Sequence, residues 1–509
     1  MKISLIVSAD ITDSYGFNVL AAQLKKFKDR NVEVGQFYIF YDFNKSYPPE
    51  AIEDLVSLCR GSDLIGISLL SSAFKNSVAI TKALKEKINC PVIWGGKHPT
   101  ADPEECVRYA DMICLSEGED ALCELVERML ENKSYDDIQN LWVRKGDWII
   151  KNPLRPVEEN LDRFLPPDYS LENKFVLDKK TLRIRPIEDR DLENMRLWYP
   201  TMMTRGCPNC CTFCTNSTDL RLRKMRSRGL DNVFGEIKIF LKKYPDTKRI
   251  FFRDDCISAM PLDFIKEFCR RWKEEINLPC SCSGVIATSP DFEEKIKLLT
   301  DAGFTGLKMG IQSGCERVRR FVFARVGETD EVIMKAARIL RKWAHGKNCY
   351  YMITDNPYES EEELVQSIRF TSRVPRPFSL SLYSLNFYPG TAIYNRAING
   401  GIIKDKEQAL QESTMDFKDT YLGRVFLLLR FFELPPFFVN FLTNKKIYSN
   451  KIYRKSFNLF FWFLCRSKLP TRWIRAPRLK DPDTWEIIRW IVWQGIERAS
   501  RCYHRRFVK

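Results

Sequence analysis

Three cysteines between residues 207 and 214 have a spacing that can support redox chemistry. Cys207, Cys211 and Cys214 form a CxxxCxxC array directly after an apolar segment that we predict to be a strand. Soft thiolates within one loop can wrap an iron-sulfur cluster, and three of them satisfy three irons of a 4Fe-4S cube. The fourth iron then stays open to a chelating small molecule. The array therefore predicts a cluster that takes part in chemistry as well as electron storage.

A structural zinc site is the alternative for this array. Zinc requires four closed ligands, and no second cysteine pair or Cys-His pair stands at zinc-finger spacing downstream. Cys210 offers a fourth thiol, but its adjacency to Cys211 makes the geometry poor. We therefore favour the iron-sulfur cluster and expect Cys210 to be a bystander.

The segment CPNCCTFC resembles the signature of the radical S-adenosylmethionine (SAM) superfamily. The resemblance implies that the amino and carboxylate groups of SAM chelate the open iron, and that electron transfer cleaves the sulfonium to a 5'-deoxyadenosyl radical. It also implies that the aromatic residue before the last cysteine, Phe213, packs near the adenine.

Further segments between about residues 199 and 395 resemble landmarks of the same superfamily. RIFFRDDC places Asp254 and Asp255 after the second barrel strand, where carboxylates suit the SAM ammonium group. A helix-capping aspartate pair is the alternative there. GLKMGIQSG makes Gln312 and Ser313 candidates for contacts with the SAM hydroxyl groups.

Two later segments complete this resemblance. YYMITDNPYESEEEL is similar to a glycine-bearing turn of the superfamily, but Asp355 and Tyr358 stand where glycines are common, which puts adenine contacts there in doubt. LYSLNFYPGTAIY resembles a segment that closes the barrel in many members with an N-terminal cobalamin domain.

The elements that must position these residues follow from the hydrophobic pattern of the 509-residue chain. Residues 1–135 alternate apolar runs with helical stretches, which predicts a doubly wound, Rossmann-like parallel sheet. The alternation of apolar runs and helical stretches returns in residues 196–395. Six such strand-helix units predict a partial (βα)6 barrel with reactive groups at the carboxyl ends of its strands. Residues 136–195 are charged and proline-bearing, which predicts a linker with little regular structure, and 396–509 predict a mainly helical C-terminal region.

The N-terminal domain resembles cobalamin-binding Rossmann-like domains, which are commonly marked by DxHxxG, SxL and GG. The second and third elements are present, as is a GEGE-like turn. Small residues at strand ends let a large ligand approach the backbone closely. The resemblance makes six residues candidates for cobalamin contacts: Ser68, Leu70, Gly95, Gly96, Gly118 and Glu119.

The DxHxxG element is absent, because SADITDSYGFN contains no histidine. The cobalt therefore cannot have its usual histidine ligand from this loop. His98 follows the GG turn on another element, and we favour a role for it in the loop or at the helix start. Cobalamin binding remains the prediction, and a Rossmann-like domain that has lost its ligand is the alternative.

The tail from residue 421 to 509 concentrates the positive charge of the chain. It holds 19 Lys and Arg against five acidic residues, together with five of the 11 tryptophans. Such a mixture suits peripheral contact with an anionic membrane, and a helical domain that covers the barrel is an equal alternative. In this tail Trp485, Ile488, Val492 and Ile496 share one predicted helical face. No apolar run is long enough to span a membrane, and no RNA-binding module appears.

Composition and charge limit the possible cellular location and partners of the protein. The 17 cysteines are odd in number and scattered through a long chain, which favours reduced thiols in the cytoplasm over a secreted disulfide scaffold. The start, MKISLIVSAD, lacks the apolar length of a signal peptide. We expect a cytoplasmic protein, with peripheral contact at the inner membrane face if the tail binds lipid, and no nucleic-acid partner.

Together these resemblances imply a cobalamin-dependent radical SAM methyltransferase that uses a 5'-deoxyadenosyl radical and methylcobalamin to methylate a carbon centre. An external electron donor is required, and the substrate, whether small molecule, lipid or peptide, is not specified by the sequence. A cyclase, rearrangement or oxidation enzyme of the same architecture is one alternative. A non-catalytic sensor that binds the cofactors is the other.

Overall fold

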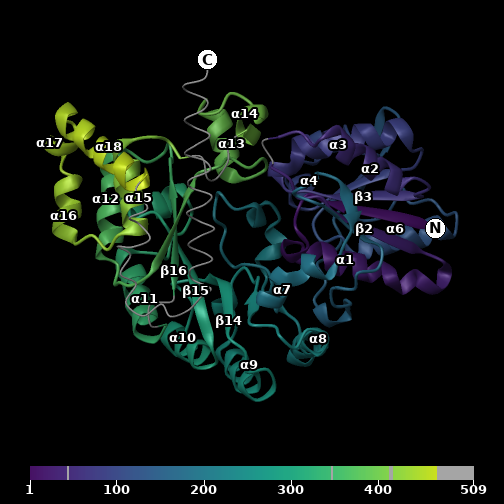
Figure 1. The fold of residues 1–509 in the computed structure, drawn as a ribbon, viewed down its shortest axis with the longest axis horizontal. Helices are drawn as coiled ribbons and strands as arrows, with labels where there is room; N and C mark the ends of the chain where they lie inside the picture. The colour runs from purple at the N-terminus through teal and green to yellow at the C-terminus, as the bar shows by residue number, and fades with distance from the viewer. Residues whose placement is uncertain (43–44, 345–347, 412–416, 467–509) are drawn as a thin grey trace. The chain divides into compact units, whose positions relative to one another are not determined.

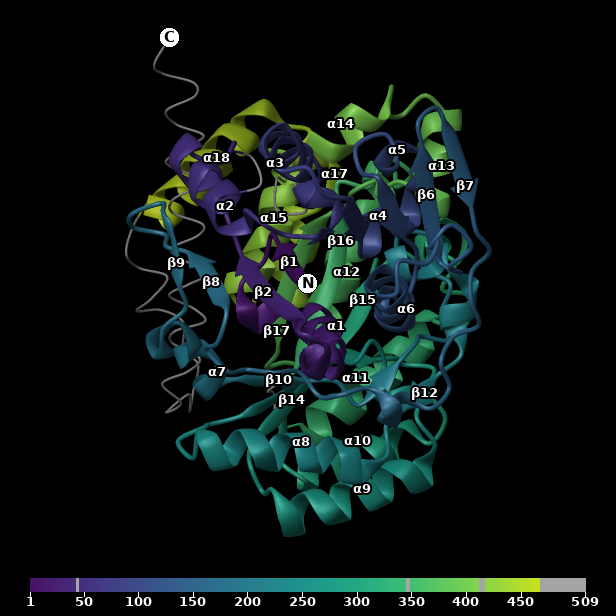
Figure 2. The ribbon, with the colours of Figure 1, turned by 90° about the vertical axis from the view of Figure 1, so that its right-hand side faces the viewer.

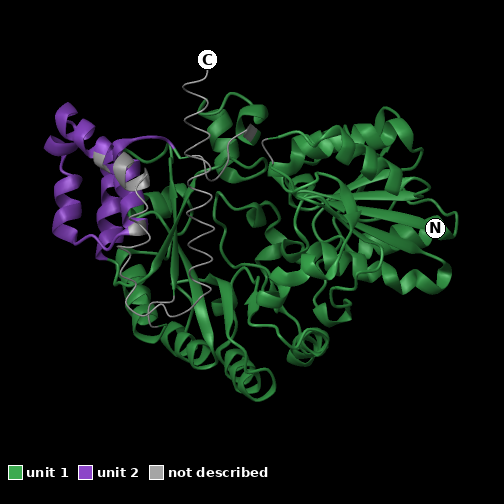
Figure 3. Cartoon of the chain, viewed as in Figure 1, with its two compact units in different colours: residues 1–360, 374–417 green, residues 361–373, 418–509 purple. Residues whose placement is uncertain are grey.

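The computed structural model of the protein describes residues 1–42, 45–344, 348–411 and 417–466. These form two compact units, shown in different colours in Figure 3. The first unit comprises residues 1–360 and 374–417, and the second comprises residues 361–373 with the chain from 418 onward. Two large parallel sheets lie within the first unit, one for each predicted α/β domain.

The N-terminal sheet has the strand order β7-β6-β5-β4-β3-β1-β2-β8-β9. Its central part, β2-β1-β3-β4-β5, is parallel, and β1 is the switch point where successive connections leave in opposite directions. This confirms the predicted doubly wound, Rossmann-like sheet, and ligands in such sheets bind at the carboxyl ends near the switch point. The predicted strands are β1 (Lys2–Val7), β2 (Glu33–Tyr38), β3 (Leu64–Ser68), β4 (Val92–Gly95) and β5 (Met112–Cys114).

Helices cover both faces of this sheet, which is why its central strands are buried on both sides. In Figure 1, α2 and α3 lie along one face, while α1 and α6 lie along the other. The helices are α1 (Tyr15–Leu24), α2 (Pro49–Cys59), α3 (Phe74–Lys87), α4 (Lys97–Ala101), α5 (Pro103–Cys106) and α6 (Glu119–Leu130). Shorter turns of helix are η1 (Ile11–Asp13), η2 (Lys25–Arg30) and η3 (Ser71–Ala73).

The prediction of little regular structure in residues 136–195 is wrong. This segment adds a hairpin beside β5 and two strands beside β2, so that it extends the first sheet at both edges. The strands are short and bordered by proline and charged residues, which hid their alternation from a pattern search. They are β6 (Leu141–Lys145), β7 (Trp148–Lys151), β8 (Lys174–Leu177) and β9 (Ile184–Pro186), with η4 (Leu161–Arg163), η5 (Asp189–Leu192) and α7 (Glu193–Leu197) between and after them.

The second sheet contains six parallel strands in the order β10-β13-β14-β15-β16-β17, as predicted for a partial barrel. Figures 1 and 2 show α8, α9 and α10 side by side along its outer surface. The strands are β10 (Tyr199–Thr201), β13 (Ile250–Phe252), β14 (Cys280–Val285), β15 (Phe304–Gln312), β16 (Cys349–Thr354) and β17 (Ser379–Ser384). The helices are α8 (Leu230–Lys243), α9 (Leu262–Glu275), α10 (Phe292–Asp301), α11 (Asp330–Trp343), α13 (Ala392–Asn399) and α14 (Lys406–Gln411).

The cysteine segment lies between two short strands that pair with each other outside the main sheets. Thr204 of β11 (Thr204–Arg205) is opposite Ser227 of β12 (Arg226–Ser227) in an antiparallel ribbon. The ribbon closes the chain between these strands into a loop at the end of β10. This loop also holds η6 (Thr215–Thr218) and η7 (Leu220–Arg223); further along the domain, η8 (Ile257–Ala259) and the π-turn η9 (Val318–Val322) follow β13 and β15.

The second unit is helical as far as it is described, in agreement with the predicted C-terminal region. Its helices are α12 (Glu361–Arg373), α15 (Tyr421–Phe431), α16 (Pro436–Leu442), α17 (Lys445–Tyr448) and α18 (Lys451–Arg466). Within the described part of the chain, none of the helices combines the length and apolar character needed to cross a membrane. The predicted face with Trp485, Ile488, Val492 and Ile496 lies outside the described residues.

Candidate active site

A cavity of about 330 Å³ opens at the carboxyl ends of β3 and β4, beside the switch point of the first sheet. We call it the interdomain cavity, because the loop that follows β11 and the end of β13 form its other wall. Both walls belong to the first unit. This volume lies within the range of about 300–1000 Å³ that is typical of small-molecule sites.

Glycines form the wall that the first sheet contributes. A Cβ added to Gly66 would lie 2.8 Å from Leu5 Cδ2, and Gly96 has a φ of +101° with no space for a side chain beside the backbone of Leu69. Gly95 shares a strand face with Ile93, and both line the cavity. Among these three glycines, only Gly95 has space for an added Cβ, 3.8 Å from its nearest neighbour, so a ligand can approach the backbone closely there.

Five of the six predicted cobalamin contacts line the interdomain cavity. They are Ser68, Gly95, Gly96, Gly118 and Glu119. Leu70 does not line it: the strand has ended two residues earlier, and Leu70 is 54% exposed at the start of η3. Residues that the sequence analysis missed are Gly66 and the start of α1, where Tyr15, Gly16 and Phe17 stand in place of the absent histidine motif.

His98 is a buried structural residue and does not line the cavity. Its side chain is fully buried, its Nδ1 lies 3.0 Å from Ser71 Oγ, and its ring contacts the ring of Phe74. Burial lowers the pKa of His98 to about 4. This agrees with the expected role at a helix start, since His98 lies in the first turn of α4.

The cysteine loop borders the opposite wall, where Gly206 and Asn216 line the cavity. Cys207 follows Gly206, whose φ of +106° and close approach to the backbone of Lys224 exclude any side chain there. The amide of Cys207 donates to Leu222 O at 3.0 Å, and the amide of Cys214 donates to Cys211 O at 3.1 Å. These bonds fold the loop back upon itself.

Burial raises the pKa of all three predicted cluster ligands, and repulsion between neighbouring thiolates adds to this rise at Cys207 and Cys214. Burial raises the pKa of Cys207 to about 11, and the nearby thiols Cys211 and Cys214 add to the rise. Burial also raises the pKa of Cys211 and of Cys214. These shifts disfavour the thiolate forms in the absence of a cation, and a bound cationic centre would lower the pKa values and stabilise the thiolates. Within the described ranges, no three or more His, Cys, Asp or Glu side chains are arranged so that they could hold a metal ion.

The predicted SAM contacts at the end of β15 divide into an accessible residue and an enclosed one. Gln312 has a φ of +68°, and its amide folds over Gly310, where an added Cβ would lie 2.3 Å from Nε2. Ser313 is buried, and its hydroxyl donates to Glu359 at 3.0 Å and accepts from the amide of Cys315. Phe213 packs edge to face on Phe323 with ring centroids 5.1 Å apart.

The two aspartates after β13 have different environments. Asp254 is fully buried, and its carboxylate accepts from the amides of Met203 and Thr204 and from Thr204 Oγ1 at 2.6 Å. Burial raises the pKa of Asp254 to about 6. Asp255 is exposed and lines the interdomain cavity. Asp254 therefore holds the turn that leads into the cysteine loop, while Asp255 faces the open space.

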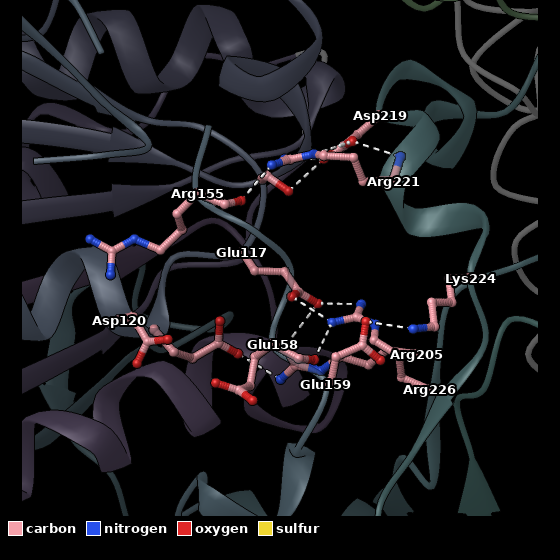
Figure 4. Close-up of polar contacts among 12 residues, drawn as sticks. Glu117, Asp120, Arg155, Glu158, Glu159, Arg205, Asp219, Arg221, Lys224 and Arg226 are labelled. Atoms are coloured by element: carbon pink, nitrogen blue, oxygen red, sulfur yellow. Dashed lines mark hydrogen bonds and ion pairs between the residues drawn. The ribbon is translucent and has the colours of Figure 1, made fainter. Parts of the chain in front are cut away.

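Charged residues connect the two walls of the cavity. Glu117 receives both terminal nitrogens of Arg226 at 2.8 Å and Arg205 Nη1 at 3.2 Å, while Arg205 Nη2 binds Glu119 at 2.6 Å (Figure 4). The two arginines outweigh the effect of burial and lower the pKa of Glu117. We call Glu117, Glu119, Arg205 and Arg226 the arginine clamp. In the sequence, the pattern that could have indicated this clamp is a basic residue on each of the two strands that flank the cysteine loop, Arg205 and Arg226.

A second polar bridge crosses the cavity beside the cysteine loop. Lys97, at the start of α4, donates to Asn216 Oδ1 at 2.5 Å, and Asn216 stands two residues after Cys214. Both residues line the cavity together with Asp255. Desolvation by the surrounding cavity walls raises the pKa of Asp255, and the charge of Lys97 offsets only part of this rise.

Two families match the chain in the two α/β domains. The family described as B12 binding domain matches residues 1–126, and the radical SAM superfamily matches residues 201–371. An uncharacterized methyltransferase of Pyrococcus horikoshii is 25% identical over 67% of this chain and 70% of its own length. The bacteriochlorophyllide d C-8(2)-methyltransferase of Chlorobaculum tepidum is 22% identical over 70% of this chain and 72% of its own length.

Solved structures share this fold at low sequence identity. The radical SAM methyltransferase TsrM from Kitasatospora setae, solved with cobalamin and a [4Fe-4S] cluster, has a TM-score of 0.61 and 16% identity, with 78% of each chain covered. OxsB, a cobalamin-dependent SAM radical enzyme solved with aqua-cobalamin and SAM, has a TM-score of 0.62 and 15% identity. That match covers 84% of this chain and 66% of OxsB.

The contrast between the two aspartates yields a prediction about stability. Asp254→Ala leaves the buried amides of Met203 and Thr204 without an acceptor, so we expect the free energy of unfolding to fall by about 2–3 kcal/mol. Asp255→Ala, at an exposed position, should change it by less than about 0.5 kcal/mol. Urea denaturation of the apoprotein, followed by tryptophan fluorescence, measures both. Equal losses in the two variants would contradict the assignment of Asp254 to the loop.

Proposed function

The chain belongs to the radical SAM superfamily and carries a B12-binding domain, and on this premise we propose that it is a cobalamin-dependent methyltransferase that acts by radical chemistry. The observation that carries the proposal is the interdomain cavity. One wall is formed by the strand ends of the B12-binding domain, and the other includes Gly206 and Asn216, which flank the three cysteines in the radical SAM domain. A methyl donor bound on one wall and a radical generated at the other would face the same space, as methylation of an unactivated carbon requires.

The glycine wall supports the assignment of cobalamin to the first domain. Gly95 has space beside its backbone, against which a macrocycle can lie, while Gly66 and Gly96 pack closely on Leu5 and Leu69 at the same end of the sheet. The cavity-lining residues include no histidine, so we propose that the cobalt has no histidine ligand from this wall. Tyr15 and Phe17 of α1 also line the cavity and are buried, so they add apolar surface to this wall.

The cysteine loop supports the assignment of the cluster and SAM to the second domain. When they are bound, the cluster and SAM supply a 5'-deoxyadenosyl radical and cobalamin carries the methyl group. In this proposal Cys207, Cys211 and Cys214 hold the cluster, while Phe213, Gln312 and Asp255 bind SAM. Asp254 and Ser313 fix the loops that carry these residues, because their polar atoms are engaged within the protein.

The residues around the cavity would also control its electrostatics and solvent content. The arginine clamp and the bridge from Lys97 to Asn216 tie the two walls together and hold the reacting partners at a fixed separation. A small-molecule substrate fits the cavity, and the reducing equivalents come from an external electron donor, since the reaction consumes electrons that the protein's side chains do not supply.

The first test of this function is the identity of the products from SAM. After anaerobic reconstitution with iron, sulfide, cobalamin and a reductant, we expect both 5'-deoxyadenosine and S-adenosylhomocysteine, measured by mass spectrometry. Cys211→Ala should abolish both, because SAM is bound at the cluster, whereas Cys210→Ala should retain them. Deoxyadenosine alone would favour a cyclase, rearrangement or oxidation enzyme, and neither product would favour a sensor.

The second test is the effect of filling the glycine wall. A Cβ at Gly95 contacts protein atoms no closer than 3.8 Å, so Gly95→Leu should fold normally and extend its side chain toward the bound macrocycle. We expect cobalamin affinity to fall at least tenfold, a cost of about 1.4 kcal/mol. The measurement is cobalamin absorbance retained after gel filtration, with a titration for the dissociation constant. Gly235→Leu, on α8 away from the cavity, is the matched control, and equal retention in both variants would argue against this wall as the cobalamin site.

We also propose that the second unit makes peripheral contact with an anionic membrane. Phe437 and Phe441 of α16 are 74% and 50% exposed, and exposed lysines of α17, Lys445 and Lys446, follow within one turn. Exposed aromatic rings beside lysines combine apolar insertion with attraction to acidic headgroups.

Sedimentation with lipid vesicles tests the membrane proposal. We expect the protein to pellet with vesicles that contain phosphatidylglycerol, less at high salt, and not with neutral phosphatidylcholine. Replacing Phe437 and Phe441 together by Ser should reduce partitioning by about tenfold or more, because both rings lose their burial in lipid. Trp148→Ser removes a similarly exposed ring from the β7 strand and should have no effect. Equal sedimentation with both vesicle types would contradict the proposal.

A further inference from the structure

A buried arginine of the radical SAM domain contacts the sulfur of one predicted cluster ligand. Arg325 follows η9 and precedes α11, and its Nη1 lies 3.4 Å from Cys211 Sγ. Its side chain is only 7% exposed. Among the described residues, Cys211 is the one of the three cysteines whose sulfur accepts a hydrogen bond from a charged side chain. The sulfurs of Cys207 and Cys214 instead accept from the backbone amides of Asn209 and Asn216.

The guanidinium group of Arg325 is fixed by contacts on its other sides. Glu328, 3% exposed, accepts from Arg325 Nε at 2.6 Å and from Nη2 at 2.5 Å. Nη2 also donates to Gly310 O at 3.0 Å, within β15. A bidentate ion pair with a buried carboxylate leaves the arginine little rotational freedom. Nη1 is therefore directed at the sulfur by the fold.

A fixed donor at a cluster sulfur has a defined electrostatic consequence. Reduction adds one negative charge that is shared by the irons and their sulfur ligands, so a hydrogen bond and a nearby positive charge stabilise the reduced form more than the oxidised form. Reduction potentials of iron-sulfur clusters depend on such hydrogen bonds and on local charge. Glu328 acts in the opposite direction, because its carboxylate offsets the charge of the arginine.

We propose that Arg325 is a positioning residue that raises the reduction potential of the cluster through its hydrogen bond to Cys211, and that Glu328 limits this increase. The proposal rests on the proposed function, because it takes Cys211 as a cluster ligand. By setting the reduction potential, Arg325 would control how readily the external electron donor reduces the cluster. It also links that control to β15, since the same guanidinium group holds the carbonyl of Gly310 two residues before Gln312.

The test is a redox titration of the reconstituted cluster, followed by electron paramagnetic resonance in the absence of substrate. Compared with the wild type, Arg325→Met should shift the midpoint potential downward, because it removes both the charge and the donor. Arg325→Gln, which retains a neutral donor, should lie between the two. Glu328→Gln should shift the potential upward. Arg320→Met, a neighbouring exposed arginine, should leave it unchanged.

Iron content and thermal stability, measured on the same samples, separate this proposal from a purely structural role. A structural role would lower iron content or stability in both Arg325→Met and Glu328→Gln without shifting their potentials in opposite directions. Unchanged potentials in both variants, or shifts of the same sign, would overturn the proposal. If Cys211→Ala retains a full cluster, the ligand assignment fails, and with it the proposed function at this site.

Discussion

The carboxylate of Glu117 is shared by two arginines of the radical SAM domain, and the width of the interdomain cavity depends on that interaction. Arg226 is 1% exposed at its side chain, so its charge would be costly to bury without the two bonds of 2.8 Å that it makes to Glu117. Arg205 binds Glu117 and Glu119 from the strand that leads into the cysteine loop. A buried charge that needs its partner in one geometry fixes the distance between the elements that carry the two groups.

Around this clamp, both domains place functional residues at the ends of parallel strands, for the same topological reason. Loops that follow parallel strands meet at one edge of the sheet and are free to vary while the strands hold the core. In the B12-binding domain this edge carries small residues such as Ser68, Gly95 and Gly96, and in the radical SAM domain it is a folded cysteine loop. The bond from Lys97 to Asn216 crosses between them, so one cavity is shared by two separately folded sheets.

Buried ionisable groups beneath the cysteine loop, on the side of the protein core, maintain its shape. Asp254 accepts three donors from Met203 and Thr204, and Arg325 connects Cys211 with β15. Such groups are expensive to bury unless every bond is made. We infer that the protein tolerates this cost because the loop must keep its geometry before any cofactor binds. Apolar contacts are not directional, so they would fix that geometry less well than hydrogen bonds do.

The sequence alone determined the two α/β domains and the cysteine array, and five of its six candidate cobalamin contacts line the cavity. These depend on local patterns: apolar periodicity, CxxxCxxC spacing, and small residues directly after strands. Only the tertiary structure decided that residues 136–195 extend the sheet, that Asp254 faces inward while Asp255 faces the cavity, and that Arg205, Arg226 and Arg325 act on the site. The polar contacts of Asp254, Arg226 and Arg325 join residues 50, 109 and 114 positions apart, and the pairing of distant charges leaves no periodic pattern in the chain.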